Sequence, residues 1–240
     1  MNSRSQSNKR EAGFSLFELV IAMGVTLAIM AVASTLLAGA FKQRASNLDT
    51  IDALADAQRA LNIMSREIAD AGFNLTDNGI VEADSVTDAN GNSTIRVRAN
   101  LNKFDLSPSI SDTARNGIGV VGQDAGEDIK YFIYPTTNTS LLARYDAYAV
   151  AGGNSTVLAN RLDGLHIHYF SQYVTYSTSG CDITSVSAAE VTPSAAKYVV
   201  IAVCVGVEAV GSPGSPGYQP SRSVLLVSDV ALRNSNLTTY

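Results

Sequence analysis

Residues 14–71 are patterned as one long helix whose character changes midway. Leu19 to Phe41 holds no charged residue, and 23 residues in a helix extend for roughly 35 Å, enough to cross a membrane core of about 30 Å. From Leu48 to Ala71, apolar residues instead recur every three or four positions, which predicts one face for a globular domain. Proline is absent from this segment, and Ala71-Gly72 is expected to end it. The pattern predicts one helix from Phe14 to Ala71.

After Gly72 the hydrophobic pattern changes from the period of a helix to that of strands. Short β-branched and aromatic runs are bounded by turn residues, of which Asn90-Gly91 is the clearest tight-turn pair. Val199 to Val207 is apolar on both alternating faces, which is typical of a central strand. We therefore expect an α+β fold, with residues 72–240 forming an antiparallel sheet packed on the helix. The expected strands are Thr94–Ala99, Ile118–Val121, Asp128–Tyr134, Ser140–Tyr145, Thr156–Ala159, Leu162–Tyr169, Lys197–Glu208 and Ser223–Leu232.

Length and charge narrow the class of protein. The 240 residues fit one domain and an N-terminal segment. The net charge is −5; residues 1–13 hold three basic residues and Glu11, a contribution of +2, so the remainder carries −7. An acidic domain argues against nucleic acid as a partner, because phosphate binding needs a basic face.

The apolar segment from Leu19 to Phe41 has two general interpretations. In a secretory signal, Ala38-Gly39-Ala40 would be the cleavage site and a soluble protein would begin near Phe41. The segment is too long for that, because a signal core runs about 7–15 residues. In a single-span anchor, the flanking charges suffice, but Glu18 is unexplained. A charged side chain in a membrane helix is costly and usually marks a function.

A third interpretation rests on the residues around Gly13. A short basic leader ends at Gly13; Phe14 and a Ser-Leu-Phe run follow, with Glu18 before the apolar segment. This constellation resembles the class III signal of type IV prepilins and type II secretion pseudopilins. The resemblance implies a prepilin peptidase that cuts between Gly13 and Phe14, N-methylation of Phe14, and pairing of Glu18 with the N-terminus of a neighbouring subunit. The proline that major pilins often carry midway along this helix is absent.

Looser similarities lie in the C-terminal part. The Asp128–Tyr134 run, Leu141 to Arg144 and the stretch from Val157 to Tyr169 resemble PilW-type minor pilins, as does the closing Ala231-Leu232-Arg233-Asn234. J-type pseudopilins of type II secretion systems share much of this plan. The resemblance implies a pilin-like lollipop: residues 1–13 as leader, 14–41 as transmembrane and filament-core helix, 42–71 as its amphipathic continuation and 72–240 as a β-rich ectodomain.

The implied function is that of a minor pilin, a non-enzymatic subunit that helps to initiate or cap a type IV pilus. Its implied partners are the prepilin peptidase, other minor pilins, the major pilin and the inner-membrane assembly platform. It would span the inner membrane once, with a periplasmic ectodomain, before entering a cell-surface pilus. A J-type pseudopilin is one alternative, and a membrane-anchored binding module or adhesin, in which Glu18 has no role in assembly, is another.

Other residues carry weaker signals. Cys181 and Cys204 form a disulfide or remain thiols, and their spacing excludes a CxxC motif or a four-ligand zinc set. His166 and His168 share one face of a strand, but no third metal ligand is evident, and we expect no metal or cofactor. The acidic run Asp84–Asn92, with Asp88, and the group Asp124, Glu127 and Asp128 are expected to serve turns rather than calcium. Tyr173 and Tyr176 suit an adhesive surface or a hairpin rim. No catalytic motif is present.

Overall fold

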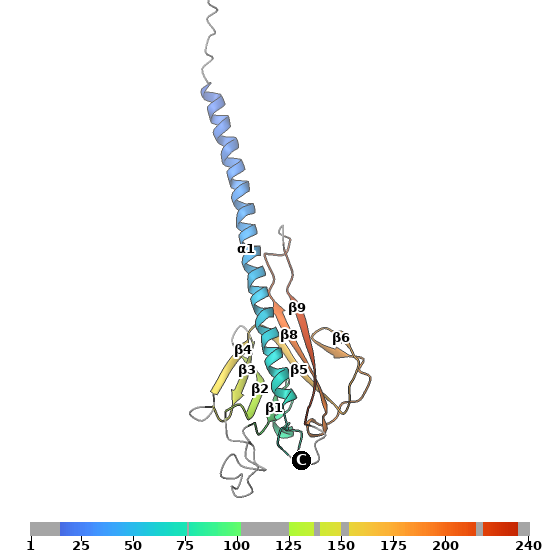
Figure 1. Cartoon of the computed structure of the whole chain (residues 1–240). Coiled ribbons are helices and arrows are strands. Elements are labelled where there is room, and N and C mark those ends of the chain that lie inside the picture. Colours follow the sequence, from blue (N-terminus) through green and yellow to red (C-terminus); the bar gives the residue numbers. More distant parts are fainter. Residues whose placement is uncertain are drawn as a thin grey trace, which may run out of the picture. The chain divides into compact units, whose positions relative to one another are not determined.

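The structure, a computed structural model, describes residues 15–75, 77–101, 125–136, 140–149, 154–214 and 218–234. The chain divides into two compact units, Met1–Ser46 and Asn47–Tyr240. One long apolar helix begins in the first unit, and the second unit holds antiparallel sheets, so the predicted α+β class is confirmed (Figure 1).

Helix α1 runs from Leu16 to Ala69 and has 54 residues. It begins two residues after the predicted start and ends two residues before the predicted end. Phe14, where the helix was predicted to begin, lies outside the described residues. Every side chain from residue 15 to 42 is exposed. By length and composition this part of α1 can cross a membrane. An isolated apolar surface of this size is unfavourable in water, so it requires a covering of lipid or of other protein.

The part of α1 that belongs to the second unit buries one face. Large side chains fill its last turns, with Leu61, Met64 and Ile68 no more than 2% exposed. The prediction was wrong at Leu48 and Ile51, which are 52% and 60% exposed. Leu48 and Ile51 are separated from Ala57 by successive steps of three residues, each of which turns about 60° round the helix, so both face away from the buried side. The buried residues of α1 are Ala53, Ala57, Ala60, Leu61, Met64, Ile68 and Ala69.

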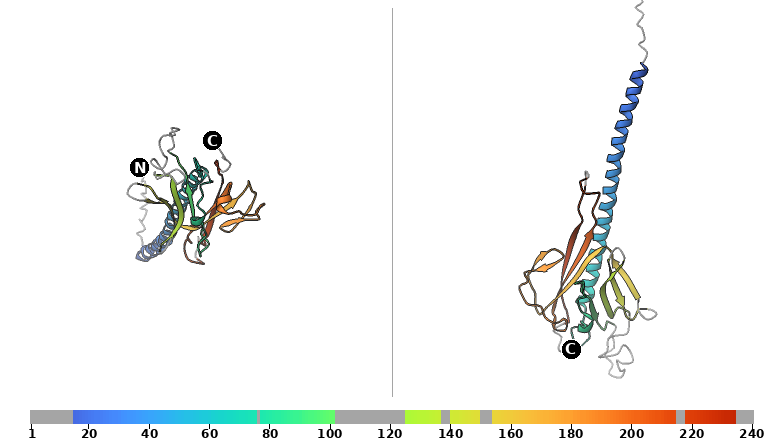
Figure 2. Two further views of the ribbon diagram at one scale, coloured as in Figure 1. Left: turned by 90° about the horizontal axis from the view of Figure 1, so that it is seen from below. Right: turned by 180° about the vertical axis from the view of Figure 1, so that it is seen from behind.

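Two antiparallel sheets lie on either side of this buried part of α1 (Figures 1 and 2). The first sheet has the order β1-β2-β3-β4 and the second has the order β5-β8-β9, where one sheet had been expected. Leu61, Met64 and Ile68 pack in one core with residues of both sheets, including Leu142 and Val203. The strands are β1 (Ile95–Arg98), β2 (Asp128–Pro135), β3 (Ser140–Asp146), β4 (Asn154–Ala159), β5 (Leu162–Phe170), β8 (Tyr198–Val207) and β9 (Arg222–Ala231).

These strands confirm seven of the eight predicted from the sequence, with ends displaced by at most two residues. The eighth, Ile118–Val121, lies outside the described residues. Strand β8 is the central one, as its unbroken apolar run predicted. Ile201 pairs with Ile167 of β5 on one side and with Ser228 of β9 on the other. Residues 198–205 are buried because the helix covers one face of the sheet and a hairpin covers the other.

That hairpin was not predicted. It consists of β6 (Ser177–Ser179) and β7 (Asp182–Thr184), which are too short and polar to give a strand signal. Its Ile183 packs with Phe170, Tyr198 and Val200 in a second small core on the outer face of the β5-β8-β9 sheet. Two single-turn 3-10 helices, η1 (Glu82–Asp84) and η2 (Pro193–Ala195), complete the described elements.

The chain leaves α1 through a tight backbone crossing. Gly72 (φ +76°) and Gly79 (φ +74°) both have positive φ. A Cβ built on Gly79 would stand 2.1 Å from the Gly72 nitrogen and 2.3 Å from the Arg98 carbonyl oxygen. Only glycine allows two backbones to approach so closely. The predicted stop at Ala71-Gly72 is therefore a turn that brings the chain back against β1, where the Gly72 N–H donates to the Arg98 carbonyl oxygen at 2.9 Å.

Candidate functional site

Glu18 lies in the first turn of α1, directly before the uncharged stretch. Gly13 and Phe14, the predicted cleavage and methylation residues, lie outside the described residues. The neighbours of Glu18, Leu16 and Phe17, are 80% and 73% exposed. A carboxylate among exposed apolar side chains needs an opposite charge once the segment is covered, because an unpaired charge in apolar surroundings is strongly unfavourable.

The hydroxyl groups of the same segment are satisfied inside the helix. Thr26 Oγ1 donates to the Ala22 carbonyl oxygen at 2.7 Å, and Ser34 Oγ donates to that of Met30 at 2.8 Å. Such bonds to the preceding turn let serine and threonine sit in lipid or against another helix. The surface that this segment offers is therefore apolar, with Glu18 as its charged group.

Cys181 and Cys204, for which the sequence left two states open, are joined in a disulfide. Cys204 is fully buried in β8, and Cys181 directly precedes β7, so the bond ties the hairpin to the central strand. A carboxylate oxygen of Asp163 lies within 4.8 Å of both sulfur atoms. With both sulfurs bonded to each other, this group has no thiolate to offer a metal ion.

The histidine pair has acidic partners that the sequence analysis missed. His168 Nε2 lies 2.7 Å from Asp182 Oδ1, and its Nδ1 lies 2.6 Å from Glu190 Oε1. His166 Nδ1 lies 3.6 Å from the other oxygen of Asp182. Burial alone would lower the pKa of His168, but the hydrogen bonds to Glu190 and Asp182 together raise it above its usual value. Among the described residues, this cluster is a network of charged contacts and does not bring three possible ligand atoms within 4.8 Å of one another.

Asp182 and Glu190 follow His168 by 14 and 22 residues. Because they sit in a polar stretch without periodicity, nothing local connects them to the strand. The two cysteines were the one signal in the sequence for this contact. A disulfide between Cys181 and Cys204 would draw Asp182, the next residue, onto the sheet that carries the histidines.

The acidic residues that the sequence offered as possible calcium ligands bind other groups. Asp88 Oδ1 accepts hydrogen bonds from the backbone N–H groups of Asn90 and Asn92, both at 2.8 Å, which closes the turn. Arg96 binds Asp128 through two nitrogens and Asp84 through a third, and its hydrogen bond to Asp84 is the main cause of the lowered pKa of that carboxyl. Buried Glu127 accepts a hydrogen bond from a backbone N–H. Asp124 lies outside the described residues.

The two tyrosines that suited an adhesive surface or a hairpin rim, Tyr173 and Tyr176, differ in their surroundings. Tyr173 is 68% exposed and stacks edge-to-face on Tyr198, with ring centres 5.4 Å apart. Tyr176 donates a hydrogen bond to Asp229 Oδ1 at 2.7 Å, which joins the hairpin to β9. Tyr176 thus has a structural role at a hairpin rim, and Tyr173 is the more exposed of the two.

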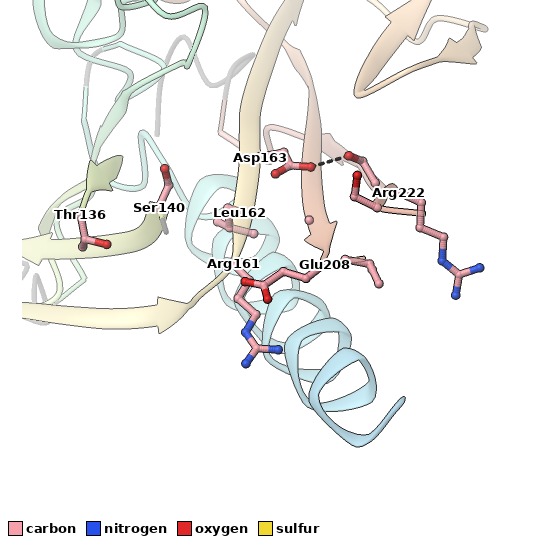
Figure 3. Close-up of a pocket in the computed structure, with 11 residues that line it drawn as sticks. Thr136, Ser140, Arg161, Leu162, Asp163, Glu208 and Arg222 are labelled. Carbon is pink, nitrogen blue, oxygen red and sulfur yellow. Dashed lines mark hydrogen bonds between the residues drawn. The ribbon is translucent and has the colours of Figure 1, made fainter. Parts of the chain in front are cut away.

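An open groove of about 590 Å³ lies at the ends of β5, β8 and β9. Figure 3 shows Thr136 and Ser140 on one side and Asp163, Glu208 and Arg222 on the other, with Leu162 and Arg161 between them. The Ser223 hydroxyl donates to the Asp163 carboxylate. The lining residues contain both charges and several hydroxyls but no histidine. The lining therefore offers charged and hydroxyl groups for polar contacts.

Comparison with known proteins gives no assignment: no family model, no curated protein and no solved structure matches the chain.

Proposed function

We propose that the protein is a minor pilin of the PilW type, a non-enzymatic subunit that helps to initiate or cap a type IV pilus. The observation that supports this most is the make-up of α1. One helix begins beside Glu18, continues with exposed apolar side chains, and ends with its last turns buried among two sheets. A helix of this kind has one half to be covered by lipid or by other helices and another half that anchors a folded domain.

In this proposal the apolar half of α1 serves twice. It first holds the unassembled protein in the inner membrane, with the β domain in the periplasm. It then leaves the bilayer and packs against other apolar helices in the fibre. Glu18 is expected to pair with the amino group of Phe14 in a neighbouring subunit, because a carboxylate transferred into apolar surroundings needs a positive partner. The pairing also fixes how far one subunit slides along the next.

The proposal is tested at the N-terminus of the protein. The full chain is expressed with and without a prepilin peptidase, and its N-terminus is determined by intact mass and terminal sequencing. We expect a peptidase-dependent start at methylated Phe14. A start near Phe41 would make the protein a secreted soluble one, and retention of Met1 would make it an ordinary membrane anchor. Either result rejects the proposal.

A second experiment separates processing from assembly. Glu18→Ala is expected to be cleaved and membrane-bound but absent from sheared fibres. Asp52→Asn, which removes an exposed acid farther along the same helix, is the control and is expected to enter fibres normally. Normal incorporation of Glu18→Ala would instead favour a membrane-anchored binding module. A J-type pseudopilin is distinguished by the pathway that a deletion disables, which would be protein secretion rather than pilus assembly.

A further inference from the structure

The side chain of His168, on the outer face of the second sheet, is held between two carboxylates from separate parts of the chain. His168 lies on β5, Asp182 is the first residue of β7, and Glu190 lies in the segment that leads to η2. Asp182 Oδ1 lies 2.7 Å from Nε2 of the ring, and Glu190 Oε1 lies 2.6 Å from Nδ1. His168 therefore links both β7 and the segment after it to the sheet.

Two carboxylates so close to the ring require His168 to carry a positive charge. A neutral imidazole has one N–H and can donate to only one of them. The other contact would then set a nitrogen lone pair against a carboxylate oxygen, which is repulsive. The imidazolium donates to both, and hydrogen bonds between charged groups have such short distances. Only 16% of the side chain is exposed, so water has little access to replace a carboxylate that leaves.

Acids and phenols outnumber bases around this ring. Strand β8, which lies between β5 and β9, places the apolar Val200 opposite His168. Negative groups nearby stabilise a cation, so these surroundings favour the charged ring. The other titratable groups near His168 and its two partners are His166 on β5, with Nδ1 3.6 Å from an oxygen of Asp182, Tyr169 beside Glu190, and Asp229 on β9, which binds Tyr176.

The two carboxylates differ in how firmly the fold holds them. Asp182 follows Cys181, which is bonded to β8, and its Oδ1 also accepts a hydrogen bond from the Ile183 N–H at 2.7 Å. The side chain of Glu190 is 52% exposed, and within the described part of the chain its contact is with His168. Glu190 is therefore the partner that leaves when the ring keeps a single N–H.

Glu190 helps to hold a segment that covers the second small core. Apolar side chains of this segment pack on that core. Backbone hydrogen bonds also attach the segment: the Ser187 N–H donates to the Thr175 carbonyl oxygen, and the Val191 N–H donates to that of Tyr169, both at 2.9 Å. A segment held by few bonds opens locally at low cost, so loss of the Glu190 contact should make it open more often.

We propose that His168 is a pH-sensitive latch, which holds residues 185–190 over the outer face of the second sheet while it is protonated and releases Glu190 when that proton is lost. Burial lowers the pKa of His168, but the hydrogen bonds to Glu190 and Asp182 outweigh burial and raise it above 6.5. The latched form is thus fully stabilised below pH 6.5, and this stability is lost as the pH rises through the raised pKa. The latch belongs to the domain itself, so it does not depend on the pilin proposal.

The protonation of the ring is tested by NMR of the full chain in detergent, with ¹⁵N-labelled histidine. The chain has two histidines, so two rings give signals, and either His166→Gln or His168→Gln assigns them. We expect both nitrogens of His168 to carry protons at pH 6.5, and one proton to be lost only at higher pH. A ring with a single N–H at pH 6.5 would overturn the proposal.

The release is tested by hydrogen exchange of the Ser187 and Val191 amides, in the unchanged chain and in Glu190→Ala. Comparison of the two chains at equal pH cancels the intrinsic pH dependence of exchange. We expect severalfold faster exchange in Glu190→Ala at low pH, and convergence of the two chains as the His168 proton is lost. Glu208→Ala removes another exposed acid and is the matched control, which should exchange like the unchanged chain. Equal exchange at low pH, or a difference that persists unchanged at high pH, would show that His168 is no latch.

Discussion

The phenol of Tyr131 on β2 donates a hydrogen bond to the carboxylate of Glu67 on α1. Tyr131 is fully buried, and Glu67 also accepts from Arg144 Nε at 3.0 Å. Arg144 in turn lies 3.5 Å from Asp146 on the same strand. The helix is thus joined to the first sheet by a polar link beside the apolar core.

Substitutions at the two ends of this link are expected to lower the stability of the domain by unequal amounts. Tyr131→Phe leaves Glu67 with Arg144 and should lower the free energy of unfolding by about 1 kcal/mol. Glu67→Ala leaves a buried phenol and a partly buried guanidinium without their acceptor, which should cost about 2–4 kcal/mol. Urea unfolding of the purified chain measures both values. The double variant should lose less than the sum of the single ones, since both single changes break the same bond. Strictly additive losses would mean that the two groups do not interact.

The backbone crossing predicts a large difference between two glycine substitutions. Gly79→Ala would force a Cβ into the backbone of Gly72 and Arg98 and should cost more than about 3 kcal/mol. Gly91 also has a positive φ, +85°, but nothing lies within 4 Å of its Cβ position. Gly91→Ala should therefore cost only the strain of that conformation, about 1–2 kcal/mol. Thermal melts that show equal losses for the two variants would contradict the described crossing.

Two isoleucines of α1 offer a matched test of which face is buried. Ile68 is fully buried, whereas Ile51 is 60% exposed. Ile68→Ala should destabilise the domain by about 2–5 kcal/mol through lost burial and a cavity. Ile51→Ala should change stability by no more than about 0.5 kcal/mol, as exposed substitutions usually do. The denaturation midpoints of the two variants measure the difference. A large loss from Ile51→Ala would show that the helix also buries the opposite face.

The buried phenols predict a loss of stability at alkaline pH. Burial is the main cause of the raised pKa values of Tyr131, Tyr169, Tyr176 and Tyr198, and Asp229 contributes further at the last two. The pKa of Tyr198 rises from 10.0 to about 12. A phenol is neutral when protonated, so the folded chain keeps these protons more tightly than the unfolded one. The resulting stability is complete below pH 10 and declines as the pH rises through about 12.

Phenolate absorbance, followed from neutral to strongly alkaline pH, checks this behaviour. Some of the tyrosines should titrate late and together with the loss of circular dichroism. Tyr198→Phe should remove one late-titrating group. Titration of all tyrosines near pH 10 in a chain that is still folded would show that these phenols are not buried.

The elements of this fold were predictable where a local pattern defines them. The apolar run of β8 gave both its position and its central place, and α1 was visible from its uncharged stretch and its later repeat. The division into two sheets was not visible, because strand order depends on pairing between distant segments. Leu48 and Ile51 continue the apolar spacing of α1, but repeated steps of three turn them away from the face that Ala57, Met64 and Ile68 share. The acidic partners of His168 could not be predicted from the sequence, since they belong to a polar stretch that a disulfide holds in place.

The packing of β9 on α1 determines the order in which the molecule can be completed. Ser65 and Ser228 are 2.8 Å apart through their hydroxyl oxygens, although 163 residues separate them in the chain. At about 5–20 residues per second, a ribosome needs roughly 8–33 s to make that stretch. The buried stripe of α1 therefore waits for its partner strand long after the apolar half of the helix has been made. Entry of that half into a membrane can precede folding of the domain, and the exposed stripe needs protection from aggregation during the interval.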